Sequence, residues 1–149
     1  MILTMDYNTV IEQQRIFFNT HKTKDVNFRI QELKRLKTVL KKNEDLLFEA
    51  IYKDFKKSSY ETYATELSVI YSEIDTAVKK VKKWAHVKKR IAGLLNLPGV
   101  SYSIPEPFGT VLVIGAWNYP YQLSLAPVVA AIAAGCTVVL KPSEVSFHT

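Results

Sequence analysis

The sequence is poor in cysteine and has no long uninterrupted hydrophobic run. Its 149 residues include one cysteine, Cys136, so no disulfide can form within the chain, and no Cys/His cluster has zinc-site spacing. The most apolar stretch, 124–140, is short for a membrane span and is interrupted by Pro127 and Gly135. Met1 to Asp6 lack the basic flank and apolar core of a signal peptide. We therefore expect a soluble protein of a reducing compartment, the cytoplasm, with no membrane partner and no metal site.

Glycine and proline are also scarce, and they are confined to one part of the chain. All five glycines and all six prolines lie beyond residue 90. Residues 1–90 hold 19 of the 20 Lys and Arg and 12 of the 14 Asp and Glu, a net charge of +7, whereas residues 91–149 carry −1. Because Gly and Pro end helices and favour turns, the first part is predicted to form long helices and the second to turn often.

Apolar residues recur at helical spacing through the first part. Ser58-Ser59-Tyr60-Glu61 fits a capping box, which marks the start of a helix. A long stripe follows, made of Ala64, Leu67, Tyr71, Ile74, Val78, Val81 and Ala85. A coiled coil is one interpretation of this stripe. We favour packing against the second part of the same chain.

The second part predicts a strand, a helix and a strand. Thr110 to Ile114 is a continuous β-branched run, typical of a strand buried on both faces. Pro120 suits the first turn of a helix that is apolar almost all round, 123–134, and is expected to be deeply covered; Gly135 suits its end. Thr137 to Leu140 is the second strand. This βαβ unit predicts an α/β fold with a parallel sheet, and 100–104 alternates like an exposed, arm-like strand.

Polar residues follow both predicted strands. Gly115 to Pro120 comes after the first strand, and Lys141-Pro142-Ser143-Glu144 comes after the second. In parallel sheets a nucleotide binds at the carboxyl ends of the strands, and a carboxylate past the second strand can bind ribose hydroxyls. Lys141 could bind the same hydroxyls or a 2′-phosphate. However, Gly115 to Tyr119 is not a G-x-G-x-x-G loop, so the usual diphosphate cradle is missing.

The stretch EPFGTVLVIGAWNYPYQLSLAPVVAAIAAGCTVVLKPSE, residues 106–144, closely resembles the class 3-like branch of the aldehyde dehydrogenase superfamily. The WNYP and KPSE motifs at this spacing are highly specific. The upstream helices resemble that branch too, in Arg29-Ile30, Asn43-Glu44, Asp54 to Ser58, Glu73-Ile74 and Trp84, so that the resemblance covers nearly the whole chain.

The resemblance implies an incomplete aldehyde dehydrogenase fold. Residues 1–90 would be the helical part of the cofactor-binding domain, 91–106 a connecting and oligomerisation strand segment, and 107–149 the first βαβ unit of a Rossmann-like sheet. The family oxidises an aldehyde to a carboxylic acid with NAD or NADP, through a cysteine thiohemiacetal and a thioester. A homodimer is expected for the complete enzyme.

The resemblance also assigns roles to individual residues. Asn118 matches the family's oxyanion donor; the alternative is an ordinary helix cap. Lys141 and Glu144 match adenosine-ribose contacts, with a solvated strand end as the alternative. Tyr63 and Tyr119 resemble residues lining the aldehyde tunnel, although aromatic residues on packed helices are often only core. The full set expected at the cofactor is Ile114, Gly115, Ala116, Trp117, Lys141, Ser143 and Glu144.

Two residues that the family's chemistry needs are not among these 149. The nucleophilic cysteine and the glutamate base of the family come downstream of KPSE. Cys136 cannot replace the nucleophile, because it stands at a strand entrance where a buried thiol behaves as a small hydrophobe. We therefore expect this chain to be the N-terminal piece of a longer enzyme, inactive alone and poorly folded. The alternative is a truncated remnant without catalysis.

A binding module is the remaining alternative. Residues 79–90 include many lysines, which could bind nucleic acid or an anionic membrane surface. Val78, Val81 and Ala85 nevertheless interleave with the lysines along an apolar stripe, as in a solvated helix face, and no nucleic-acid motif accompanies them. We expect no nucleic-acid partner.

Overall fold

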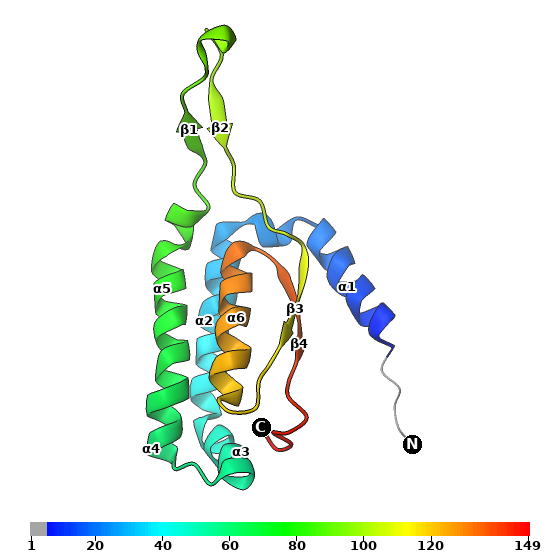
Figure 1. Ribbon diagram of the computed structural model, residues 1–149, viewed down its shortest axis with the longest axis vertical. Coiled ribbons are helices and arrows are strands. Elements are labelled where there is room, and N and C mark those ends of the chain that lie inside the picture. The colour runs from blue at the N-terminus through cyan, green and yellow to red at the C-terminus, as the bar shows by residue number, and fades with distance from the viewer. Residues whose placement is uncertain (1–5) are drawn as a thin grey trace.

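The computed structural model describes residues 6–149. Residues 1–5, most of the segment predicted to lack signal-peptide features, lie outside the described residues. The helices are α1 (Tyr7–Asn19), α2 (Val26–Lys42), α3 (Glu44–Phe55), α4 (Ser59–Thr62), α5 (Ser68–Trp84) and α6 (Pro120–Ala134), and the strands are β1 (Lys88–Arg90), β2 (Ser101–Ser103), β3 (Thr110–Ile114) and β4 (Thr137–Lys141). In Figure 1, α2, α5 and α6 form a helical layer beside β3 and β4, and β1 and β2 project from it as an arm.

The predicted βαβ unit is confirmed. β3 and β4 pair in parallel, from Thr110 opposite Thr137 to Ile114 opposite Lys141, and α6 connects them. Pro120 occupies the first turn of α6, where its missing N–H costs nothing. Gly135 ends the helix at a φ of +87°, a backbone conformation that favours glycine.

Two expectations about burial in this unit are wrong. Leu112 is 62% exposed and Ile114 66% exposed, because α6 covers one face of β3 and, among residues 6–149, α1 contacts the sheet on the other side without burying these two side chains. The helix α6 is likewise not covered all round. It buries one side, which includes Val129 and Ala133, while Leu123 is partly exposed.

The long apolar stripe packs as expected against the second part of the chain. α5 lies against both α2 and α6, which excludes the coiled-coil interpretation for the described residues. The stripe forms the centre of the core, although Ala64, at its start, is exposed. The fully buried core side chains are Leu33, Ile51, Leu67, Ile70, Ile74 and Val81. Ser58 caps α4 through a bond that its hydroxyl accepts from the Glu61 N–H at 3.1 Å.

The helix containing this stripe departs from a regular α-helix at one point. A single stretch of π-helix, η2 (Tyr63–Leu67), joins α4 to α5. Within η2, Glu66 is completely buried. A buried carboxylate needs hydrogen-bond donors or a positive charge beside it, so this π-helical turn is expected to contact such groups.

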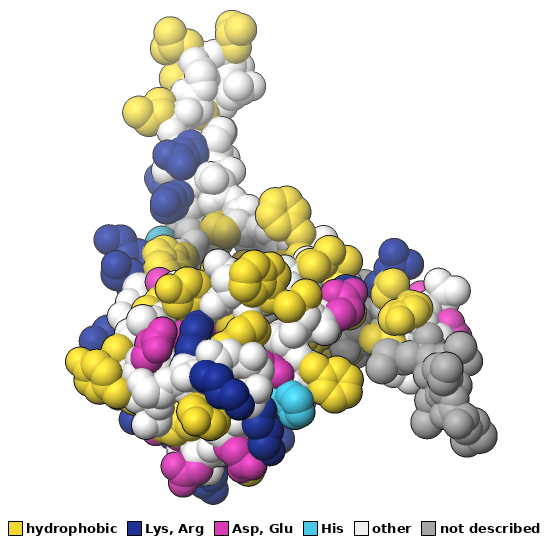
Figure 2. All heavy atoms as spheres, turned by 60° about the horizontal axis from the view of Figure 1, so that its bottom comes forward, with side chains coloured by type: hydrophobic (Ala, Val, Ile, Leu, Met, Phe, Trp, Pro, Cys, Tyr) yellow, Lys and Arg dark blue, Asp and Glu magenta, His cyan; other side chains and the backbone are white. Residues whose placement is uncertain are grey.

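The arm is a two-stranded hairpin rather than a single strand. β1 pairs antiparallel with β2, so that Lys88 lies opposite Ser103 and Arg90 opposite Ser101. The helical assignment of residues 88–90 is therefore wrong, since α5 ends at Trp84. Figure 2 shows hydrophobic side chains at the hairpin tip and basic ones nearer its base. Ile91, Leu94 and Leu95 in this tip are each at least 87% exposed.

Candidate functional site

The two polar segments that follow the strands lie next to each other. The backbone N–H of Gly115 donates a hydrogen bond to the carbonyl of Lys141 at 2.9 Å, which extends the β3–β4 pairing by one step. The Gly115–Pro120 loop and the Lys141–Glu144 loop therefore start from the same edge of the sheet. This is the edge at which parallel sheets bind nucleotides.

Gly115 allows its loop to lie directly on α6. A Cβ atom added at this position would stand 2.1 Å from the Ser124 hydroxyl oxygen and 3.3 Å from the Ser124 Cβ. Contacts as short as the first do not occur in proteins, so a side chain at residue 115 would displace the Ser124 hydroxyl and still press on the Ser124 Cβ. The absence of a side chain at residue 115 thus lets the loop pack closely on α6.

Asn118 does not cap α6, so the helix-cap interpretation is wrong. The N-cap residue is Tyr119, and no side chain of the loop itself bonds to the first turn. Asn118 is exposed, and within residues 6–149 its side-chain amide takes part in no hydrogen bond. Its N–H groups are therefore available to a bound molecule.

Two residues that the sequence pattern does not single out as site residues, Lys57 and Glu66, hold this loop. The ammonium of Lys57 donates a hydrogen bond to the backbone carbonyl of Asn118 at 2.9 Å. It also forms an ion pair with the Glu66 carboxylate at 3.0 Å and lies 4.2 Å from the ring centroid of Tyr119. Glu66 in turn accepts the N–H groups of Tyr121 at 2.9 Å and Gln122 at 3.3 Å. The one signal in the sequence is an acidic residue adjoining the apolar stripe, at Glu66.

The second loop carries an exposed ion pair. Lys141 Nζ lies 2.6 Å from Glu144 Oε1, and this hydrogen bond lowers the pKa of the Glu144 carboxyl below its ordinary value. Ser143 accepts the backbone N–H of Val145 at 3.3 Å, which tightens the turn. The loop therefore presents one ammonium and one carboxylate to solvent, both able to bind hydroxyl groups.

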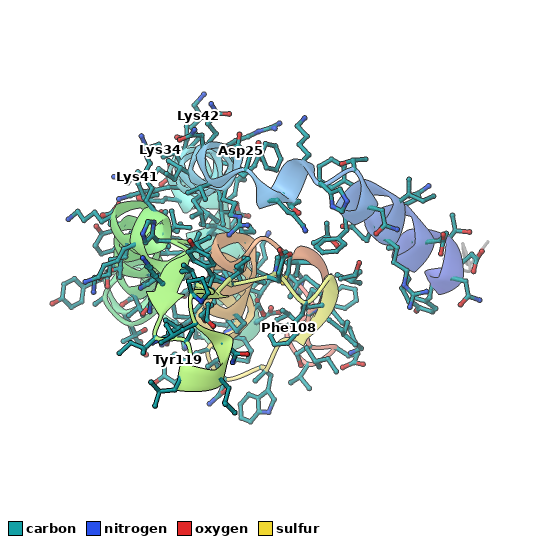
Figure 3. The ribbon with its side chains drawn as sticks, turned by 90° about the horizontal axis from the view of Figure 1, so that it is seen from above. Asp25, Lys34, Lys41, Lys42, Phe108 and Tyr119 are labelled. Atoms are coloured by element: carbon teal, nitrogen blue, oxygen red, sulfur yellow. The ribbon has the colours of Figure 1, made fainter. Side chains whose placement is uncertain are left out.

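The remaining predicted residues lie around this edge. Ile114, Ala116 and Trp117 are exposed, as a cleft lining requires. Tyr119 lies on the side of the molecule opposite to the α2 lysines in Figure 3. Tyr63 is 45% exposed and lies in η2, the same segment as Glu66, whereas Tyr119 is the N-cap residue of α6. Tyr63 also contacts the core, with its ring edge-on to Tyr71.

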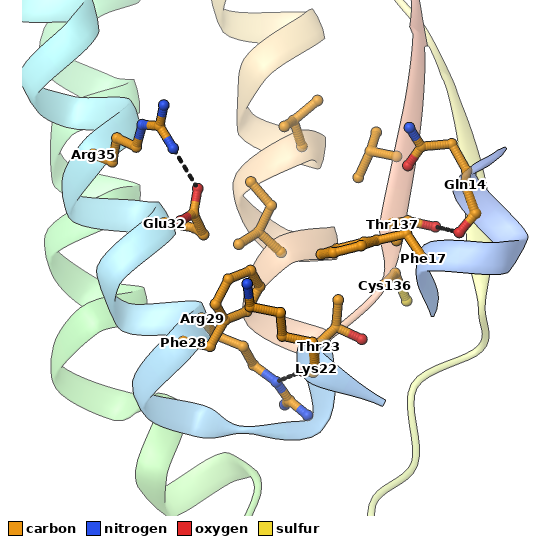
Figure 4. A pocket seen from close by; sticks show the side chains of 13 residues that line it. Gln14, Phe17, Lys22, Thr23, Phe28, Arg29, Glu32, Arg35, Cys136 and Thr137 are labelled. Atoms are coloured by element: carbon orange, nitrogen blue, oxygen red, sulfur yellow. Dashed lines mark hydrogen bonds and ion pairs between the residues drawn. The ribbon is translucent and has the colours of Figure 1, made fainter. Parts of the chain in front are cut away.

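Cys136 lies at the far end of the sheet from Asn118. It precedes β4, whose length separates it from Lys141 by roughly 16 Å at the usual rise per residue. Its thiol is buried and borders a cavity of about 530 Å³ between α1, α2 and α6 (Figure 4). Arg29 also lines this cavity, and its side chain donates a 2.6 Å hydrogen bond to the carbonyl of Thr23. Cys136 is thus in no position to act with Asn118.

Among residues 6–149, no helix has both the length and the apolar character needed to cross a membrane.

Comparison with known proteins agrees with the geometry. The sequence pattern of the Aldehyde dehydrogenase family matches residues 3–149. The 4,4'-diaponeurosporen-aldehyde dehydrogenase of Staphylococcus aureus is 43% identical over 141 residues, which cover 92% of this chain and 31% of that protein. The dimeric NADP-preferring aldehyde dehydrogenase of Rattus norvegicus is 38% identical over 93% of this chain and 30% of its own length.

Comparison with solved structures leads to the same group of proteins. A solved structure described as the substrate-bound state of Staphylococcus aureus AldH superposes with a TM-score of 0.90 at 42% identity, over 95% of this chain and 31% of that one. The chain therefore spans about a third of the length of the proteins it matches. With the match of its sequence pattern over residues 3–149, the chain belongs to the aldehyde dehydrogenase family.

Proposed function

We propose that the protein to which these residues belong oxidises an aldehyde to a carboxylic acid with NAD+ or NADP+. The observation that carries the proposal is the environment of Asn118. Its backbone is anchored by Lys57 at the carboxyl edge of a parallel sheet, while its side-chain amide is left without a partner among the described residues. Family membership supplies the reaction class.

The role proposed for Asn118 is to donate a side-chain N–H to the substrate oxygen. When a thiolate adds to an aldehyde carbon, the carbonyl oxygen becomes an alkoxide. A fixed neutral donor stabilises that charge more than it stabilises the ground-state carbonyl, and therefore accelerates the step. An anchored backbone matters because the donor then needs no reorganisation during the reaction.

The residues at the strand edge fit a nicotinamide dinucleotide. Lys141 and Glu144 are exposed at the end of β4, where ribose hydroxyls bind in related folds, and Gly115 brings backbone into the place where a side chain would intrude. Ile114 to Trp117 would line the cofactor, and Ser143 stands beside the ribose contacts. When bound, the nicotinamide supplies the hydride acceptor. Both NAD and NADP remain proposed, since Lys141 could also face a 2′-phosphate.

The nucleophile is proposed to lie outside these residues. Cys136 is 6% exposed and stands at the opposite end of β4. The family resemblance places the nucleophilic cysteine and the glutamate base C-terminal to Glu144. The proposed activity is accordingly that of the whole protein, of which these residues supply the oxyanion donor and part of the cofactor site. Tyr63 and Tyr119 are proposed to line the aldehyde entrance.

We also propose a homodimer in the cytoplasm. The hairpin tip exposes Ile91, Leu94 and Leu95 to solvent, and isolated apolar arms of this kind are normally covered in an assembly. The resemblance of this segment to an oligomerisation arm makes a second copy the expected cover. A single cysteine suits a reducing compartment.

The test is aldehyde-dependent formation of NADH or NADPH, followed by absorbance. The whole protein encoded by the gene and a protein ending at residue 149 are assayed side by side with a panel of aliphatic and aromatic aldehydes. We expect turnover by the whole protein and none by residues 1–149. A whole protein that binds no dinucleotide and oxidises no aldehyde would contradict the proposal and favour a non-catalytic remnant.

A further inference from the structure

The ammonium of Lys57 makes several contacts with the start of α6 and the residues beside it. It pairs with Glu66 at 3.0 Å, donates to the Asn118 carbonyl at 2.9 Å and lies over the Tyr119 ring at 4.2 Å. Two of its three N–H groups donate to these oxygens, and its positive charge also lies over an aromatic ring. The Lys57 side chain is 13% exposed, so solvent screens these contacts little.

Glu66 completes the start of α6. The first helical residue, Pro120, has no N–H; Tyr121 and Gln122 donate to Glu66; and Leu123 donates to the carbonyl of Tyr119 at 2.9 Å. Every backbone donor of the first turn is thereby satisfied. Glu66 does what an N-cap side chain usually does, from a helix that is remote in sequence. Its negative charge also faces the positive end of the α6 dipole.

These contacts fix the Asn118 segment from three directions. Gly115 is bound to Lys141 at one end, the α6 start is bound to Glu66 at the other, and the Asn118 carbonyl is held between them by Lys57. A peptide group with its carbonyl held and its neighbours restrained has little freedom to rotate. The direction in which the Asn118 side chain leaves the backbone is therefore set by the Lys57–Glu66 pair.

We propose that Lys57 and Glu66 are positioning residues for the oxyanion donor, acting through the backbone of Asn118 and the first turn of α6. Neither residue touches the substrate. The inference rests on the function proposed above, because it assumes that Asn118 is the donor.

The experiment compares four variants of the whole protein. Lys57→Met removes the ammonium and keeps most of the aliphatic side chain, Lys57→Arg keeps a cation, and Glu66→Gln keeps the shape of the carboxylate without its charge. Lys53→Met is the matched control, because Lys53 forms a 2.6 Å surface pair with Glu49 on the same helix face of α3 and has no contact with the loop.

Two readouts are measured on each variant: kcat and KM for aldehyde and cofactor, and hydrogen exchange of the amides of residues 116–123. Lys57→Met is expected to lower kcat by about tenfold or more, up to the ~10²–10³ that loss of the donor itself costs, with little change in the cofactor KM. Lys57→Arg should recover part of that loss. Exchange at Tyr121 and Gln122 should accelerate in Glu66→Gln, and Lys53→Met should change neither readout.

The outcomes separate this inference from the proposed function. Unchanged kcat in Lys57→Met would overturn the positioning role, and a lowered melting temperature measured beside it would leave a structural role only. Loss of kcat in Lys53→Met to the same extent would also overturn it. A wild-type protein without any aldehyde oxidation would instead contradict the proposed function. In that case the exchange data would still show whether Lys57 and Glu66 hold the loop. Unaltered exchange in both Lys57→Met and Glu66→Gln would show that they do not.

Discussion

The Glu66 carboxylate accepts the backbone N–H of Tyr121 at 2.9 Å, although 55 residues separate the two in the chain. Glu66 belongs to the charged, helical part of the sequence, and Tyr121 belongs to the glycine- and proline-containing part. This bond therefore joins the helical layer to the βαβ unit at the start of α6. The stability of the layer and the geometry of the candidate site depend on the same carboxylate.

Replacing Glu66 by alanine should destabilise the protein strongly. The variant leaves the Lys57 ammonium and two helix N–H groups without their buried partner, and removal of one member of a buried pair typically costs about 3–5 kcal/mol. Urea unfolding should show a lowered midpoint. The control is Glu49→Ala, which removes an exposed partner of Lys53 and should leave the midpoint nearly unchanged. Equal midpoints for the two variants would contradict the role given to Glu66.

Gly115→Ala should destabilise mainly through a clash with the Ser124 hydroxyl. The new Cβ would stand 2.1 Å from the Ser124 hydroxyl oxygen, and overpacking of this kind costs about 1–3 kcal/mol. The double variant Gly115→Ala/Ser124→Ala removes that oxygen and should recover most of the loss, which urea unfolding of both variants measures. If the single variant is as stable as the wild type, the loop does not pack on α6 as described.

Much of this architecture could be predicted from local pattern. Pro120 and Gly135 bracket α6, and Ser58 caps a helix, because each of these signals acts on its own neighbours in sequence. The buried stripe from Leu67 to Val81 follows from helical spacing alone. These features depend on local backbone preference and periodicity, which a single sequence displays.

The parts that escaped prediction depend on distant partners. In the sequence, nothing distinguishes Lys57 from the many other lysines of the first part. Only its contacts with Glu66 and Asn118 in the structure do so. The strand Lys88–Arg90 continues a lysine-rich helical pattern and becomes a strand only because Ser101–Ser103 pairs with it. Burial of β3 on both faces was overestimated. An apolar run indicates that a strand face can be buried, but it does not indicate which element, if any, lies against that face.

Asp54 should make the protein sensitive to acid. Its side chain is 5% exposed; burial raises the pKa of its carboxyl, but hydrogen bonds from Thr149 and His148 outweigh burial and hold that pKa below its ordinary value of about 3.8. A carboxyl with a lowered folded-state pKa contributes stability above its unfolded pKa and loses it as the pH falls through the folded one. The free energy of unfolding should therefore decline as the pH drops below about 3.8.

The variant Asp54→Asn tests this assignment. It should be less stable than the wild type at neutral pH and should show a flatter decline in acid, both measured by urea unfolding across a pH series. Asp75→Asn is the control, because the pKa of Asp75 is also lowered, by Lys37, but that pair is exposed. An acid slope that Asp54→Asn leaves unaltered would show that other carboxyls carry the effect.

Charges on the hairpin tip should dissociate the proposed dimer. Leu94→Asp/Leu95→Asp places two carboxylates where apolar side chains are 87% and 101% exposed in the single chain. Buried and unpaired in an interface, they would cost far more than they do in water. Sedimentation should therefore show a monomer. Leu46→Asp, at an exposed leucine of α3, should leave the dimer intact, and a variant hairpin that still sediments as a dimer would exclude the tip from the interface.

The most direct measurement is the steady-state rate of aldehyde oxidation by the whole protein carrying Asn118→Ala. The account predicts that kcat falls by about 10²–10³ while dinucleotide affinity, measured by fluorescence, and the unfolding midpoint stay close to wild type, because the Asn118 amide has no partner within residues 6–149. A variant with wild-type kcat would contradict the oxyanion role, and with it the reason for the anchored loop.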